Sequence, residues 1–309
     1  MICRFDVIIV KWNINFVASY CAEEAGNSRF LGTQPKRRFY EFGLFTCGYQ
    51  HLPLETAFYD AKAFGYDYIE LWGGRPHAFA SDLLTGDASK IRDLIQKYQM
   101  PVYIYTPEHN AYPYNYMLGT ERQWEESMNY LSSAFCAASD IGAQYTLVSI
   151  GHGGSATPNQ RKQRLERSLY RLCAAAEEAG QTILLETLTP YESNTCTRLE
   201  DLREILDKID SPALLGMCDV VPPFVQKEDP VDYARVLGKR MGHLHLVDND
   251  GQSDSHLLPG DGIMPLRKII QELREAGYDG MATIELVTNY MSDPSFYAEL
   301  ALNRVKELL

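Results

Sequence analysis

The sequence predicts an α/β protein with a single (β/α)₈ TIM barrel over residues 39–309, and three observations support this fold class. Short apolar runs rich in β-branched and aromatic residues alternate with longer segments of helical periodicity, the pattern of βα units around a parallel sheet. About eight such units follow one another, as a closed barrel requires. A chain of 309 residues suits one large domain of this kind. The alternation alone leaves a doubly wound open sheet as the alternative.

The predicted strands are apolar runs of five to eight residues. The first, FYEFGLFT, is rich in aromatic residues, and the fifth, TILLE, ends its apolar run at Glu186. In chain order the eight predicted strands cover residues 39–46, 67–71, 101–106, 144–150, 182–186, 213–219, 241–247 and 281–287.

Helices are predicted between the strands, and four of them end at a glycine. Glycine accepts the left-handed backbone conformation that commonly follows the last turn of a helix. These four helices cover residues 54–65, 122–142, 163–180 and 266–277 and end at Gly65, Gly142, Gly180 and Gly277.

Residues 1–38 lie outside this rhythm, because they contain no clear βα unit and end in the basic cluster KRR at 36–38. We interpret them as a poorly ordered N-terminal extension or a wrongly assigned start. An added helix that covers the barrel floor is the alternative.

Composition restricts the class of partner. The formal net charge is −12, which disfavours nucleic acid because phosphate binding needs clustered basic charge, and favours a small-molecule substrate. The seven cysteines are odd in number and form no CxxC pair, which indicates neither a disulfide framework nor a zinc knuckle. No apolar run approaches the ~20 residues of a membrane span. We therefore expect a cytoplasmic protein with no membrane partner.

A candidate metal site follows from the ends of the last four predicted strands. Functional groups of a parallel barrel lie at the carboxyl ends of its strands. The residues found there are Glu186, Asp219, His245 and Glu285. An unpaired carboxylate at the edge of a core is costly, and this oxygen-rich set suits one divalent ion, Mn²⁺ first, with Co²⁺, Mg²⁺ or Ni²⁺ as alternatives.

Each of these residues has a simpler interpretation when taken alone. A single histidine is usually a hydrogen-bonded core residue, and a carboxylate at a strand end often caps the next helix. The complete set of four favours the metal. His243 and His245 alternate with leucines and so point to the same face, with His245 nearer the barrel mouth. We assign His245 as the ligand and His243 as a deeper supporting or core residue.

Several stretches resemble the xylose-isomerase-like superfamily of metal-dependent sugar isomerases and epimerases. The resemblance covers about residues 41–309 and includes ELWGGRPHAFA, LETLTPYESN, HLHLVDNDGQSDSHLLPGDG and TIELVTNYM. It implies a (β/α)₈ barrel, a bound divalent metal and reversible inversion at carbon 3 of a ketose joined to lysine. The ligand positions of the family fall on the four residues named above.

Inversion requires proton removal from one face of the sugar and return to the other. Two carboxylates on opposite sides of the substrate can do this, each acting as base in one direction and acid in the other. Glu186 and Glu285 are the candidate catalytic pair. An aldose–ketose isomerase would use the same ligands to move a proton between carbons 1 and 2, so the choice of carbon 3 depends on the resemblance.

Candidate substrate-binding residues come partly from the same resemblance. Glu192 falls on a position that contacts the substrate near O1 in related ketose 3-epimerases. Those relatives have histidine and arginine where this chain has Pro222 and Gly251, which weakens an assignment to free ketoses. Other polar and aromatic groups near the mouth are candidates for the sugar or its lysyl arm, namely Asp254, His256, His152, Trp72, Glu108, Tyr112, Tyr114 and Tyr116. The three tyrosines could equally pack loops or a subunit interface.

Two rival functions belong to other classes. A DNA-repair endonuclease of the endonuclease IV type uses the same barrel, but with a trinuclear zinc site that has several more histidine ligands. The seven histidines of this chain, three of them in loops before the fourth strand, and the charge of −12 argue against it. A metal-free binding protein is the second rival, because fold alone does not establish function. Among enzymes the alternative is a ketose 3-epimerase or aldose–ketose isomerase that acts on free sugars. The resemblance also implies a homo-oligomer.

Overall fold

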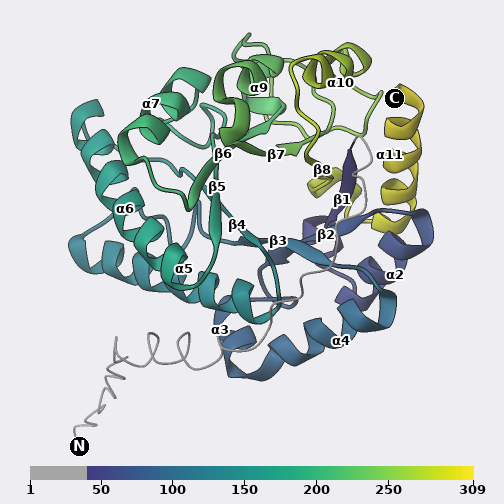
Figure 1. Cartoon of the computed structure of the whole chain (residues 1–309), viewed down its shortest axis with the longest axis horizontal. Coiled ribbons are helices and arrows are strands. Elements are labelled where there is room, and N and C mark those ends of the chain that lie inside the picture. Colours follow the sequence, from purple (N-terminus) through teal and green to yellow (C-terminus); the bar gives the residue numbers. More distant parts are fainter. Residues whose placement is uncertain (1–39) are drawn as a thin grey trace, which may run out of the picture. The chain divides into compact units, whose positions relative to one another are not determined.

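The protein folds as a closed barrel of eight parallel strands, seen in a computed structural model that describes residues 40–309. Each strand pairs with the next along the chain, and β8 (Met281–Ile284) closes the ring by pairing with β1 (Glu41–Phe45). In Figure 1 the strands form an inner ring and the helices lie outside it. The predicted (β/α)₈ barrel is therefore confirmed, and the open-sheet alternative is wrong. The interpretation of residues 1–38 lies outside the described residues.

All eight predicted strands are present. The fifth has the predicted bounds, while the predicted eighth strand was three residues too long because its pairing with β1 ends at Leu44 and Ile284. The observed strands are β1 (Glu41–Phe45), β2 (Tyr68–Gly73), β3 (Val102–Pro107), β4 (Tyr145–Ser149), β5 (Thr182–Glu186), β6 (Leu214–Asp219), β7 (Met241–His245) and β8 (Met281–Ile284).

Helices connect the strands and cover the outside of the barrel. The four predicted terminal glycines have φ angles of 85° (Gly65), 84° (Gly142), 69° (Gly180) and 88° (Gly277), which confirms the left-handed helix ends. None of the helices within residues 40–309 combines the length and apolar character needed to cross a membrane. The helices are α2 (Leu54–Phe64), α3 (Ala80–Asp82), α4 (Ala88–Tyr98), α5 (Glu121–Asp140), α6 (Pro158–Glu178), α7 (Leu199–Ile209), α8 (Val221–Val225), α9 (Val231–Leu237), α10 (Leu266–Glu275) and α11 (Pro294–Leu308). Four shorter helical turns complete the fold, η1 (Thr46–Tyr49), η2 (Leu83–Asp87), η3 (Gly238–Arg240) and η4 (Thr288–Tyr290).

The interior of the barrel is layered, because every second side chain of a strand points inward. An apolar layer consists of Tyr68, Ile104, Leu147, Leu184, Met217 and Met281. Two residues further along the same strands, toward their carboxyl ends, stand Glu70, Thr106, Ser149, Glu186, Asp219 and Thr283. The barrel thus places polar groups above an apolar floor, at the end where the strands stop.

Tyr68 is the largest side chain of the floor and is fully buried. Its hydroxyl lies 2.9 Å from Thr283 Oγ1, and its ring stacks on Tyr103. Gly43 on β1 leaves the room for this ring, since a Cβ at that position would lie 2.3 Å from Tyr68 Cε2. The glycine is therefore a packing requirement of the floor.

We expect Gly43→Ala to lower the free energy of unfolding by about 1–3 kcal/mol, because the added methyl group overpacks the floor and displaces Tyr68. Urea denaturation of both proteins measures the difference. Gly216→Ala on β6 is the matched control, since its Cβ would meet only leucine methyl groups at 3.1–3.2 Å, which can move. A Gly43→Ala loss no larger than the control's would contradict this account of the floor.

Candidate metal centre

Four side chains from successive strands converge at the carboxyl end of the barrel. Glu186, Asp219 and His245 are the last residues of β5, β6 and β7, and Glu285 follows β8 directly. One potential ligand atom from each lies within 4.8 Å of the others, and Glu285 alone is not fully buried. Donors that share one ion at about 2.0–2.2 Å lie no more than about 4.4 Å apart, so small side-chain movements would close the set.

His245 provides the sharpest indication that this set fits a metal. Its Nδ1 lies 2.8 Å from Glu285 Oε2 and 3.6 Å from Glu186 Oε1. This buried nitrogen nevertheless makes no hydrogen bond, because the angles at the 2.8 Å contact are unsuitable. Buried polar atoms in native proteins are nearly always satisfied. A divalent cation between the three groups would satisfy Nδ1 and neutralise the carboxylates.

The protonation of the cluster reflects its burial. Burial raises the pKa of Glu186 to about 8, helped by the nearby Glu285 and Asp219 and opposed by His245. Ser149 Oγ donates a hydrogen bond of 2.7 Å to Glu186 Oε2. Burial also opposes the charge on Asp219, yet the His256 imidazole holds the pKa of Asp219 below its usual value. Without a cation, the pKa values of Glu186 and Asp219 are therefore shifted in opposite directions.

The long loop after β7 brings His256 into the cluster. His256 Nε2 lies 2.9 Å from Asp219 Oδ2 and 3.5 Å from Glu285 Oε2. The loop is folded back by antiparallel pairing of Asp248 with Leu257. The Asp248 carboxylate also accepts hydrogen bonds from the backbone N–H groups of Asn249, Gly260 and Met264. His256 is thus held beside two of the predicted ligands.

Glu192 and Asp254 face each other at the mouth and hydrogen-bond through their side chains. Although Glu192 is exposed as a residue, burial of its carboxyl group and the neighbouring Asp254 raise its pKa to about 8. Burial raises the pKa of Asp254 as well. The nearby cation His256 is already paired with Asp219. Two adjacent carboxyl groups therefore remain at the mouth to receive a positively charged ligand.

Trp72 and Glu108, two of the predicted substrate contacts, form a hydrogen-bonded pair. Trp72 Nε1 donates a 2.9 Å hydrogen bond to Glu108 Oε2. Trp72 also packs in a cluster with Phe45 and Cys47, and the Phe45 ring lies 5.8 Å from the His245 ring. The pair predicted as substrate contacts is therefore linked through Phe45 to the predicted ligands.

The remaining residues predicted to contact the substrate lie in loops and differ in how far they are buried. Tyr116 is fully buried and donates its hydroxyl to Ser149 O, while Tyr114 stacks on Tyr130 with ring centroids 4.0 Å apart. Both therefore pack the protein, whereas Tyr112 is 87% exposed and remains a candidate for ligand contact. His152 is exposed, and its Nδ1 accepts a hydrogen bond from Gly154 N within its own loop.

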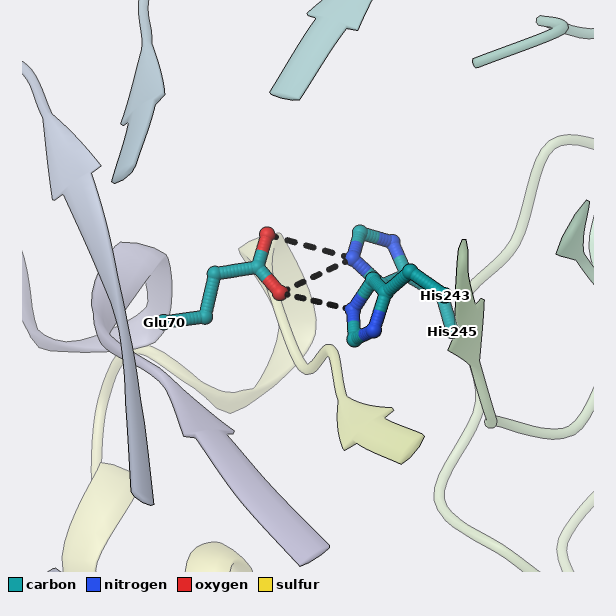
Figure 2. Close-up of side chains that lie close together, drawn as sticks. All are labelled: Glu70, His243 and His245. Atoms are coloured by element: carbon teal, nitrogen blue, oxygen red, sulfur yellow. Dashed lines mark hydrogen bonds and ion pairs between the residues drawn. The ribbon is translucent and has the colours of Figure 1, made fainter. Parts of the chain in front are cut away.

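Glu70 is a buried charge that the sequence analysis does not predict as part of the site, because it lies inside a strand and not at its end. Figure 2 shows that the Glu70 carboxylate faces two histidines of β7. Its Oε2 lies 3.1 Å from Nε2 of each histidine, and its Oε1 lies 3.2 Å from His245 Nε2. Thr106 Oγ1 donates a further hydrogen bond of 2.7 Å. The available signal was a carboxylate inside the apolar run YIELWG, the same kind of anomaly that identified Glu186.

Comparisons with known proteins agree with the barrel fold. The model of a family described as "Xylose isomerase-like TIM barrel" matches residues 58–308. The protein named fructoselysine 3-epimerase from Shigella flexneri is 48% identical over 268 residues, which cover 86% of this chain and 97% of the relative. The structure of a 3-keto-D-glucoside 4-epimerase from E. coli superposes with a TM-score of 0.74 at 17% identity, and covers 87% of this chain and 99% of its own. At that identity the superposition supports the fold alone.

The pKa of Glu186 leads to a prediction for the metal-free protein. Between the ordinary value of 4.5 and about 8, folded Glu186 keeps a proton that the unfolded chain has lost. Because the folded state binds more protons in this window, the free energy of unfolding falls as pH rises through it. Burial opposes the charge on His245, but the Glu70 and Glu285 carboxylates hold the pKa of His245 well above its usual value, which adds a slope of the same sign. Glu186→Gln should make the slope smaller.

Urea denaturation in EDTA between about pH 5 and pH 8 measures this slope. Glu299→Gln, which removes an exposed carboxylate on α11, is the control and should leave the slope as it is in the natural chain. Parallel curves for the Glu186→Gln and unchanged proteins would show that Glu186 titrates in the ordinary range.

Proposed function

This chain belongs to the xylose isomerase-like TIM barrel family, and we propose that it is a metal-dependent 3-epimerase that interconverts fructoselysine and psicoselysine. It is an isomerase of the epimerase type, as its relative at 48% identity is named. The observation that carries the finer proposal is the convergence of Glu186, Asp219, His245 and Glu285 around an unsatisfied buried Nδ1.

The four converging residues would hold one divalent ion. Two glutamates, an aspartate and an imidazole form a set of hard donors suited to Mn²⁺, with Co²⁺, Mg²⁺ and Ni²⁺ as alternatives. When bound, such an ion supplies Lewis-acid stabilisation of the oxygen atoms beside the carbon that loses its proton. His256 supports the site from outside by hydrogen bonding to Asp219.

The two glutamates provide the proton transfers of the proposed reaction. The proton on carbon 3 of a 2-ketose is acidic because removing it gives an enediolate, in which the negative charge moves onto the oxygen of the former carbonyl at carbon 2. Glu186 and Glu285 come from β5 and β8, so they approach a sugar held between them from different sides. One carboxylate would take the proton and the other would return one to the opposite face. Ser149 fixes the orientation of Glu186 through its 2.7 Å hydrogen bond.

The acidic mouth supports an amine-bearing sugar over a free ketose. In fructoselysine the nitrogen of lysine replaces O1, and this secondary amine is cationic near neutral pH. Glu192 and Asp254 would receive it as paired carboxylates. Gly251 and Pro222, which stand where free-ketose relatives have arginine and histidine, add no competing positive charge. Trp72, Glu108 and Tyr112 are left for the rest of the lysyl arm.

The proposed enzyme would be a cytoplasmic homo-oligomer that requires no nucleic acid or membrane partner. These points rest on the sequence and stay predictions.

Proton exchange in D₂O tests the reaction. With Mn²⁺ present we expect deuterium at carbon 3 of fructoselysine together with formation of psicoselysine, measured by NMR, and neither with EDTA. Glu186→Gln and Glu285→Gln should each slow epimerisation by about 10²–10⁴-fold, the usual contribution of a positioned acid or base. One of the two variants should still exchange fructoselysine at carbon 3, and the other should exchange psicoselysine.

Bound metal is measured for each variant as a control, because both glutamates are proposed ligands. Deuterium at carbon 1 in place of carbon 3 would indicate an aldose–ketose isomerase. No exchange with any divalent ion would argue against enediolate chemistry on this substrate.

Asp254→Asn tests the substrate assignment. We expect kcat/KM for fructoselysine to fall by about 10–100-fold, because a hydrogen bond to a charged group contributes about 1.5–3 kcal/mol, while kcat/KM for free psicose changes little. Asp261→Asn is the matched control, since this exposed acid of the same loop is paired with Arg304. Equal losses on both sugars would favour a free-ketose epimerase.

A further inference from the structure

We propose that Glu70 is a positioning residue for the metal, which holds the imidazole of His245 in the tautomer and orientation needed for its Nδ1 to be a ligand. This inference rests on the metal site of the proposed function and extends it to a residue on the opposite side of the ligand. It is drawn from the contacts of Glu70 in Figure 2.

Glu70 meets both histidines of β7 through the same ring atom. Its Oε2 lies 3.1 Å from His243 Nε2 and 3.1 Å from His245 Nε2, and its Oε1 lies 3.2 Å from His245 Nε2. Thr106 Oγ1 donates a 2.7 Å hydrogen bond to Oε1. All the groups that approach the carboxylate in these contacts can donate hydrogen bonds, and Glu70 and both histidines are buried.

The tautomer follows from this geometry. An ionised carboxylate can only accept hydrogen bonds, so the Nε2 atom of each histidine carries the hydrogen. A neutral imidazole with hydrogen on Nε2 has its lone pair on Nδ1. In His245 that atom faces Glu186 and Glu285, at 3.6 and 2.8 Å. Glu70 thereby presents His245 to the metal in its ligating form, the role that carboxylates commonly have behind metal-bound histidines.

Packing keeps this arrangement rigid. The ring of His243 stands edge-on to that of His245 at 5.1 Å between centroids, and the Phe45 ring lies 5.8 Å from His245 on another side. Glu70 itself stands directly above Tyr68 of the apolar floor, two residues earlier on β2. Because supporting side chains determine how accurately a metal ligand is placed, this support should be measurable as metal affinity.

A second metal ion between Glu70, His243 and His245 is the competing account, since their potential ligand atoms also lie within 4.8 Å of one another. The Thr106 hydroxyl favours the hydrogen-bonded account, because it occupies one carboxylate oxygen as a donor. In addition, His245 would have to bind one ion through each ring nitrogen. Metal stoichiometry separates the two accounts.

The test compares Mn²⁺ binding by the full-length natural protein and by Glu70→Gln, measured by titration calorimetry. The glutamine amide keeps the shape of the carboxylate but places an N–H₂ group where only an acceptor fits, which favours the wrong tautomer of a histidine. We expect one ion per chain in both proteins and about 10–100-fold weaker binding by Glu70→Gln. Activity of the variant should recover as Mn²⁺ approaches saturation, since the residue acts through the metal.

Two further variants distinguish positioning from a general structural role. Glu70→Asp remains an acceptor but is one methylene shorter, so its loss of affinity should be smaller than that of Glu70→Gln, and it serves if the glutamine variant does not fold. Thr146→Val removes another buried hydrogen bond of the barrel, 3.0 Å to Gln181, and should change thermal stability without changing Mn²⁺ affinity.

Each remaining outcome decides between the accounts. Unchanged affinity in Glu70→Gln, or equal losses of affinity in Glu70→Gln and Thr146→Val, would overturn the positioning role. Two ions per natural chain, with one lost in Glu70→Gln, would replace it with the second-site account. A natural protein that binds no divalent ion would overturn the metal site itself, and with it the proposed function, whatever the variants do.

Discussion

Three carboxylates are buried inside the barrel, and the need to compensate their charge shapes the site around them. Glu70, Glu186 and Asp219 are enclosed by strands on all sides, where an uncompensated carboxylate is strongly unfavourable. Each has a specific partner within the described part of the chain. Two imidazoles and Thr106 hydrogen-bond to Glu70, and Ser149 donates a hydrogen bond to Glu186. Asp219 hydrogen-bonds to His256 and to the backbone N–H of Val221. Within the described residues, Nδ1 of His243 and Nδ1 of His245 are both left without a hydrogen bond. Of the two, Nδ1 of His245 lies beside Glu186 and Glu285, at the proposed ligand position.

Strand geometry converts this constraint into a site. Side chains two residues apart share a face, so the apolar floor, the Glu70 level and the cluster at the mouth are successive layers of the same strands. Strands are held by pairing on both sides, and the groups proposed for metal binding and proton transfer all stand at or next to strand ends. Most groups proposed for recognising the lysyl arm stand in loops, where the sequence can change without disturbing the sheet, while Trp72 lies near the carboxyl end of β2.

The mouth shows how loops adapt such a barrel to a substrate. Pro222 is buried in the short helix α8, whose first N–H, at Val221, donates to Asp219 Oδ1 at 2.7 Å. Gly251 occupies a tight turn with φ of 74°, and its carbonyl accepts a hydrogen bond from Lys227 Nζ at 2.9 Å. The ammonium group of Lys227 thus binds a backbone carbonyl. Glu192 and Asp254 hydrogen-bond to each other at the barrel mouth. The proposal of an amine-bearing sugar as substrate rests on this distribution of charge.

From the sequence we could predict the eight strands, the glycine ends of four helices and the four residues that meet at the mouth, because strand periodicity and strand ends are local signals. The remaining features of the site arise only when the chain is folded. Only the closed barrel brings Glu70 of β2 to the histidines of β7, which are separated by more than 170 positions along the chain. Only the fold also shows that Tyr114 and Tyr116 pack against the protein while Tyr112 is exposed. Loop conformation sets His256 beside Asp219 and Glu192 beside Asp254, since these contacts depend on long-range pairing that no local pattern encodes.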